Sequence, residues 1–172
     1  MMALVSEKPE RERPPTDDAV AARLGLLVES VERQLGEAVN IRQESIPNAS
    51  VETVRLDPQR PDACFVSWAE LGVSELILQV GQGGRWELGR DLESVVLIER
   101  IVRAVIDGQV TEVRAPGRSK VTVNLDDGTQ KSSVGHNAPL GLIPIPLWRR
   151  RGRSVSYSPY RQREQGMPVT RG

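Results

Sequence analysis

The chain of 172 residues is poor in aromatic side chains, in cysteine and histidine, and in long apolar runs. Aromatic residues make up only 3%, so Val, Leu and Ile must form most of any core. One cysteine, Cys64, excludes an intramolecular disulfide, and with the one histidine, His136, it cannot supply a zinc cage. No window reaches the roughly 18 apolar residues of a membrane span, and the N-terminus lacks a signal-peptide core. We therefore expect a cytoplasmic protein with no membrane contact, metal, cofactor or small-molecule ligand.

Motifs of known chemistry are also missing. The glycine-rich stretch 81–84 runs into strand-like residues without the Rossmann spacing or a Walker lysine, which indicates a turn. Cys64 lies in an apolar stretch, where burial makes a thiol inert and favours a packing role. Asp126-Asp127-Gly128 lacks the calcium-ligand spacing and is typical of a hairpin turn. The sequence predicts no catalytic residue, and an enzyme whose site assembles only in three dimensions is the third of three functional hypotheses.

Two stretches, 17–37 and 91–107, repeat apolar residues at intervals of three or four, the period of an amphipathic helix. Thr16 is expected to cap the first helix, and Gly108 to end the second. Short β-branched or alternating segments bounded by turn residues predict strands. These segments are residues 39–46, 51–57, 63–71 and 74–80, a short strand after the glycine turn, and two or three strands within 109–133.

This order of elements predicts an α+β fold. Two amphipathic helices would pack on one face of a mainly antiparallel sheet of about six to seven strands. The domain is expected to span residues 16–135, with a disordered tail at 1–15 and a flexible, Pro/Arg-rich C-terminal extension at 136–172. The order is similar in outline to secretion-chaperone-like and toxin-immunity-like proteins, and that resemblance implies binding of another polypeptide rather than catalysis.

The first half of the C-terminal extension is unusually apolar. Pro144 and Pro146 forbid a helix and disfavour a central strand, which leaves a polyproline or edge-strand conformation. Such a segment either packs along its own domain or docks on a partner or another subunit. The residues expected to bind a partner are Leu142, Ile143, Ile145, Leu147 and Trp148.

Arginines follow this apolar segment directly. Residues 149–172 carry seven arginines against Glu164, a net charge of +6, which leaves −6 for residues 1–148. The residues expected to bind an anion or an acidic partner are Arg149, Arg150, Arg151 and Arg153. Tyr157 and Tyr160 nearby could stack on bases, so weak nucleic-acid binding is the alternative hypothesis. The leading hypothesis is a non-enzymatic protein-binding module, chaperone-like, immunity-like or part of an assembly, that contacts a protein partner or a homo-oligomer through its sheet or this C-terminal segment.

Overall fold

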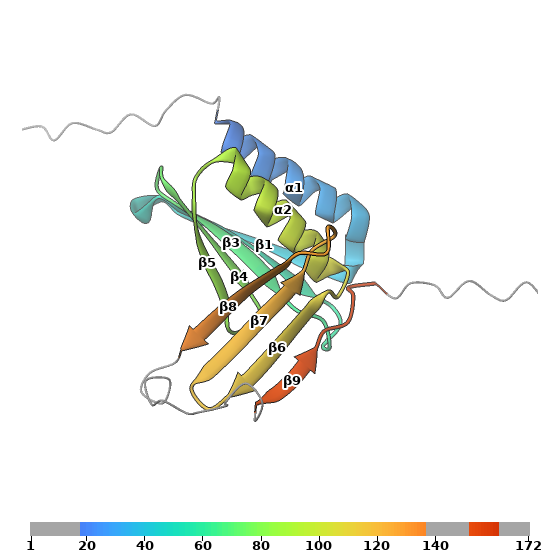
Figure 1. The fold of residues 1–172 in the computed structure, drawn as a ribbon. Helices are drawn as coiled ribbons and strands as arrows, with labels where there is room; N and C mark the ends of the chain where they lie inside the picture. The colour runs from blue at the N-terminus through green and yellow to red at the C-terminus, as the bar shows by residue number, and fades with distance from the viewer. Residues whose placement is uncertain (1–17, 137–151, 162–172) are drawn as a thin grey trace, which may run out of the picture.

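The computed structural model describes residues 18–136 and 152–161, which form two α-helices and nine strands in two antiparallel sheets (Figure 1). The helices are α1 (Ala19–Leu35) and α2 (Leu92–Ile106). The first sheet, in spatial order, is β1 (Val39–Ile46), β2 (Val51–Pro58), β3 (Val66–Leu71), β4 (Glu75–Val80) and β5 (Gly84–Gly89). The second sheet is β8 (Gln130–His136), β7 (Arg118–Asn124), β6 (Val110–Ala115) and β9 (Arg153–Ser156).

Both predicted helices are confirmed, with ends within two residues of the expected ones. The cap of α1 is Asp18, whose carboxylate accepts from the backbone N–H groups of Val20 and Ala21; the expected cap, Thr16, lies outside the described residues. At the other end of α1, the Arg161 guanidinium donates to the Leu35 carbonyl over 2.6 Å. A residue beyond the expected domain boundary therefore satisfies a carbonyl that the helix leaves without an intrahelical partner.

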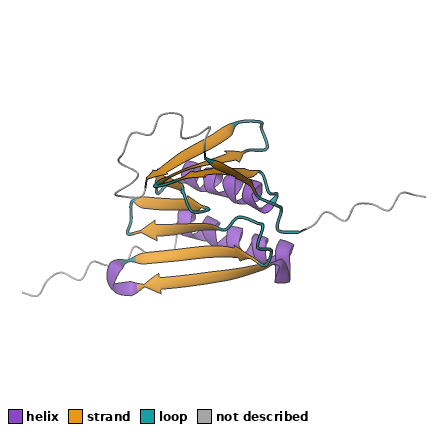
Figure 2. Ribbon diagram, turned by 90° about the horizontal axis from the view of Figure 1, so that it is seen from below, coloured by secondary structure: helices purple, strands orange, loops and turns teal. Residues whose placement is uncertain are grey.

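The core lies between the helices and both sheets. Alternate residues of β2, β3 and β4, such as Leu56, Trp68 and Leu78, are buried against the helices, as the period of two in a strand requires. Helix α2 is the more deeply buried of the two, and Ile101 and Val102 on it have no solvent exposure. Figure 2 shows the two helices next to each other on one side of the strands.

The expectation of a single sheet was wrong, because the strands on the two sides of α2 form separate sheets. The sheets meet where β5 lies next to β8, and a side chain joins them there instead of a backbone ladder. The Ser133 hydroxyl accepts from the Arg85 N–H over 3.0 Å and donates to the Arg85 carbonyl over 2.7 Å. A Cβ added to Gly135 would lie 2.9 Å from the Gly83 carbonyl oxygen, so glycine permits this close approach.

The fold continues past residue 135, the expected end of the domain. Strand β9, beyond that boundary, pairs antiparallel with β6, and Tyr160 is buried in the core with its hydroxyl donating to the Cys64 carbonyl over 2.7 Å. Residues 152–161 are therefore part of the packed structure, whereas sequence patterning assigned them to a flexible extension. The expected tail at 1–15, and the remainder of the expected extension after His136, lie outside the described residues.

Candidate protein-docking site

Strand β1 lies at the free edge of the first sheet. It is eight residues long, and within residues 18–136 and 152–161 its only strand partner is β2. The opposite edge of this sheet, β5, is closed by the contact with Ser133. An edge strand of this length presents a row of backbone N–H and C=O groups to which another strand can add.

A cleft of about 320 Å³ lies beneath α1 and is bounded on its sheet side by β1, β2 and β3. Its apolar lining includes Leu24 and Val28 of α1, Val54 of β2 and the buried Trp68 of β3. The cleft exists because α1 carries small residues on this side. A Cβ added to Gly25 would meet no heavy atom within 4 Å.

The cleft and the free edge share a strand. Ile41 of β1 packs against the core, so the alternation of a strand places Gln43 and Ser45 on the same face, and both line the cleft. An extended chain added along β1 would send every second side chain to this face of the sheet. Backbone pairing and side-chain insertion can therefore occur together at one site.

The rim of the cleft is acidic. Glu52 of β2 and Glu70 of β3 line it, and within the described part of the chain Glu52 has no ion-pair partner. Glu70 accepts from the Arg90 guanidinium over 2.8 Å, and Arg90 also contacts Asp18. The hydrogen bond from Arg90 holds the pKa of Asp18 below its usual value. The Glu52 carboxylate thus has no countercharge at the rim, which favours a cationic partner there.

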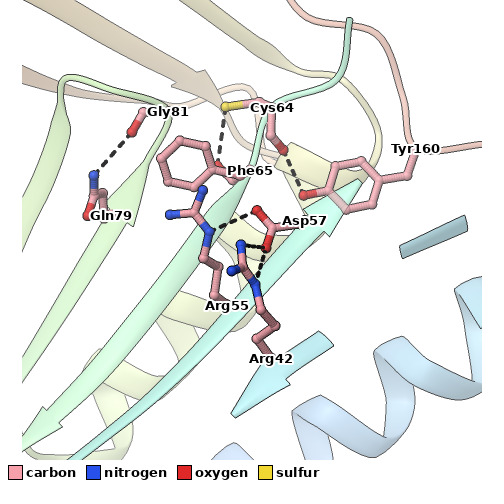
Figure 3. Close-up of polar contacts among 8 residues, drawn as sticks. All are labelled: Arg42, Arg55, Asp57, Cys64, Phe65, Gln79, Gly81 and Tyr160. Carbon is pink, nitrogen blue, oxygen red and sulfur yellow. Dashed lines mark hydrogen bonds and ion pairs between the residues drawn. The ribbon is translucent and has the colours of Figure 1, made fainter. Parts of the chain in front are cut away.

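The face of the first sheet that points away from the helices has its arginines already paired (Figure 3). Arg42 and Arg55 both donate to the Asp57 carboxylate over 2.8 Å, and the Arg55 guanidinium lies 3.8 Å from the centre of the Phe65 ring. Burial opposes ionisation of Asp57, but the two guanidiniums bring its pKa below the usual value. The charges of Arg42 and Arg55 on this face are therefore engaged by Asp57 within the fold.

The predicted interaction residues are only partly described. Arg153 is exposed on β9, opposite Arg114 of β6. The two tyrosines expected to be available for stacking are both engaged, because Tyr160 is buried and Tyr157 is half-buried in a hydrogen-bond network. The other predicted residues lie outside the described residues, and they are Leu142, Ile143, Ile145, Leu147, Trp148, Arg149, Arg150 and Arg151.

Glu112 of β6 is a fully buried carboxylate that the sequence motifs did not indicate. Its Oε2 accepts from Arg114 Nη2 over 2.7 Å and from the Tyr157 hydroxyl over 2.5 Å, and Arg114 Nη2 also donates to that hydroxyl over 2.6 Å. Burial, followed by the hydrogen bond to Glu112, raises the pKa of Tyr157. Val110 and Glu112 are two positions apart in β6 and therefore lie on the same, buried face of the strand. This spacing is the sequence signal that could have indicated a buried carboxylate. The network links β6 to the segment that follows β9.

Cys64 lies close to this network. Its side chain is buried, and burial raises the pKa of the thiol to about 12. The predicted packing role is therefore supported by its surroundings. Within residues 18–136 and 152–161, no group of three or more His, Cys, Asp or Glu side chains could hold a metal ion. Neither helix of that part of the chain is long and apolar enough to cross a membrane.

Comparison of the chain with protein-family models, with curated proteins and with solved structures finds no match.

Proposed function

We propose that the chain is a non-enzymatic protein-binding module that takes up an extended segment of another polypeptide at the free edge of β1. The backbone of the segment would pair with β1, and alternate side chains would enter the cleft beneath α1, the usual division of roles in strand addition. The observation that carries this proposal is that Gln43 and Ser45 of the free edge strand also line the cleft.

The chemistry of the cleft defines the segment that fits it. The lining around Trp68 and Val54 is apolar and suits branched aliphatic side chains, which gain free energy when they leave water. The acidic rim at Glu52 suits a Lys or Arg that follows the apolar residues of a segment running parallel to β1. We therefore expect an extended segment with alternating apolar residues and a basic end.

The alternative hypotheses have less support. The rim of the cleft is acidic and would repel a nucleic-acid backbone, and both tyrosines of the basic segment are engaged within the fold. The most unusual ionisable group, Glu112, has no solvent exposure through which a substrate could reach it. Protein binding is also the role that the division of charge along the sequence favours.

The experiment is a titration of the isotope-labelled chain with synthetic peptides of alternating Ile residues that end in Arg-Arg-Arg or in Glu-Glu-Glu. The Arg-terminated peptide should shift the amide resonances of β1 and α1, and the Glu-terminated peptide should not. Gly25→Leu fills the cleft from α1 and should abolish binding. Gly25→Ala is the matched control, because its Cβ enters open space and leaves the cleft available.

Both variants should fold, since Ala and Leu favour a helix interior over Gly by about 1 kcal/mol or slightly less. Loss of binding in Gly25→Leu would thus not reflect loss of structure. Binding that persists in Gly25→Leu, or resonance shifts confined to the second sheet, would refute the proposed site.

A further inference from the structure

We infer that the segment taken up by the cleft is residues 143–149 of a second copy of this chain. This inference rests on the function proposed above and adds the identity of the partner. The cleft requires an extended segment with alternating apolar side chains and a basic end, and "IPIPLWR" at 143–149 has both features. The segment and β1, which has eight residues, are also of similar length.

The positions of the prolines suit strand addition to a single edge. In a segment paired parallel to β1, which brings its C-terminal end near Ser45 and Glu52, every second residue directs both its N–H and its C=O towards β1. Ile143, Ile145 and Leu147 would occupy these positions against β1, which leaves Pro144 and Pro146 at the outer edge, where a missing N–H costs no ladder bond. The prolines would also prevent a further strand from adding to the assembly.

The same alternation directs the side chains. Ile143, Ile145 and Leu147 share one face of an extended chain, and Arg149 is the next residue on that face. With the aliphatic side chains in the cleft, the guanidinium of Arg149 would reach the acidic rim at Glu52. The even-numbered residues, Trp148 among them, would lie on the opposite face of the sheet.

Chain connectivity favours uptake by another copy rather than by the same one. Residues 137–151 lie between β8 and β9 in the sequence, and both of these strands belong to the second sheet. The end of β8 and the start of β9 lie at the lower end of the second sheet in Figure 1, away from the start of α1, near which the cleft lies. Two copies can exchange segments reciprocally in a closed dimer, or they can associate head to tail.

The first test uses a peptide of residues 141–151 and an isomer in which Ile and Pro exchange places (Ile143→Pro, Pro144→Ile, Ile145→Pro, Pro146→Ile). The two peptides have the same composition and charge, but the isomer turns its prolines towards β1. The natural peptide should shift resonances of β1 and α1. The isomer should bind at least about tenfold more weakly, because backbone acceptors of β1 stay unpaired. Equal binding of the two peptides would overturn the inference.

The second test uses full-length chains and light scattering coupled to size-exclusion chromatography. The wild type should associate with increasing concentration. Gly25→Leu, with a blocked cleft, and Ile145→Asp, with a charged segment, should each be monomeric, whereas an equimolar mixture should form a complex, because each variant supplies the part that the other lacks. Glu37→Lys, a change of charge at an exposed residue away from the cleft, is the control and should associate as the wild type does.

The outcomes separate this inference from the function on which it rests. A monomeric wild type whose cleft binds the Ile/Arg test peptides, but not residues 141–151, would refute self-recognition and leave the protein-binding function intact. A cleft that binds none of these peptides would refute both. A mixture of the two variants that stays monomeric would likewise refute exchange between copies.

Discussion

The buried network of Glu112, Arg114 and Tyr157 allows a quantitative test of what holds β9 and the following residues in the fold. Glu112 has no solvent exposure, and two donors serve its Oε2. Its Oε1 has no hydrogen-bond partner among the described residues. A buried carboxylate depends strongly on the partners that remain, so removal of each donor should cost far more than removal of a surface pair.

Tyr157→Phe removes the hydroxyl that donates to Glu112 over 2.5 Å and should lower the free energy of unfolding by about 1.5–3 kcal/mol, the range for hydrogen bonds to charged groups. Arg114→Ala removes the countercharge and should cost about 3 kcal/mol, the lower end for a broken buried pair, because the Arg114 side chain is 38% exposed. In a Glu112→Gln background, Tyr157→Phe should cost only about 1 kcal/mol, as for a neutral hydrogen bond.

Equilibrium urea unfolding measures these differences through the transition midpoint, provided that its denaturant dependence is unchanged. Arg100→Ala is the control, because Arg100 pairs with Asp126 and Asp127 at the surface and its removal should leave the midpoint nearly unchanged. If Arg114→Ala shifts the midpoint no more than Arg100→Ala does, the argument from a buried charge is incorrect. Equal costs of Tyr157→Phe in the wild-type and Glu112→Gln backgrounds would exclude a charge-dependent bond.

Three further predictions concern packing and ionisation. Gly83→Ala should lower thermal stability by about 1–3 kcal/mol, because its Cβ would lie 1.6 Å from the Ser119 hydroxyl oxygen, whereas Gly25→Ala should raise it. Burial raises the pKa of the Cys64 thiol to about 12, whereas the pKa in the unfolded chain is about 8.5. The contribution of this shift to the free energy of unfolding is fully present below about pH 8.5. Stability should therefore fall as pH rises from about 9 to 12, less steeply in Cys64→Ala, and parallel pH profiles of the two proteins would contradict this cause. Ile101→Asp would place an unpaired charge in the core and should abolish the folded circular-dichroism spectrum, so a cooperative melt of that variant would refute the packing of α2.

Local patterning predicted the individual elements well. The stretch 39–46 has the same bounds in the sequence analysis and in the structure, because Pro47-Asn48 marks its end and its residues favour an extended chain. The buried stripe of α1, including Val20, Leu24 and Val31, follows the helical period. The Asp127-Gly128 hairpin was also correct, since β7 and β8 pair across it.

Non-local features were not predictable in the same way. The division into two sheets depends on the placement of α2 between the strand groups, and no local pattern specifies which strands pair across a helix. Strand β9 begins at Arg153, directly after the arginine-rich stretch. The high charge of this region made the spacing of Val155 and Tyr157 hard to recognise as a strand pattern. The cleft arises from two small residues of α1, Ala21 and Gly25, and its existence depends on how α1 sits over β1.

The role of the arginines after Trp148 can be decided by the effect of salt. If Arg149 to Arg151 and Arg153 bound nucleic acid, about four phosphate contacts would give a log–log slope of affinity against salt near −3 to −4. In the proposed docking, apolar side chains in the cleft supply most of the affinity. Arg149 contributes only an exposed contact to Glu52, which salt screens over about 8–10 Å. Self-association should therefore weaken only a few-fold between about 50 and about 200 mM salt, a range over which multiple phosphate contacts would lose far more affinity. Glu52→Lys should weaken association and reduce its dependence on salt, whereas Glu37→Lys, exposed and away from the cleft, should do neither. A steep fall of affinity with salt that is retained in Glu52→Lys, together with tight binding of duplex DNA, would establish the nucleic-acid alternative instead.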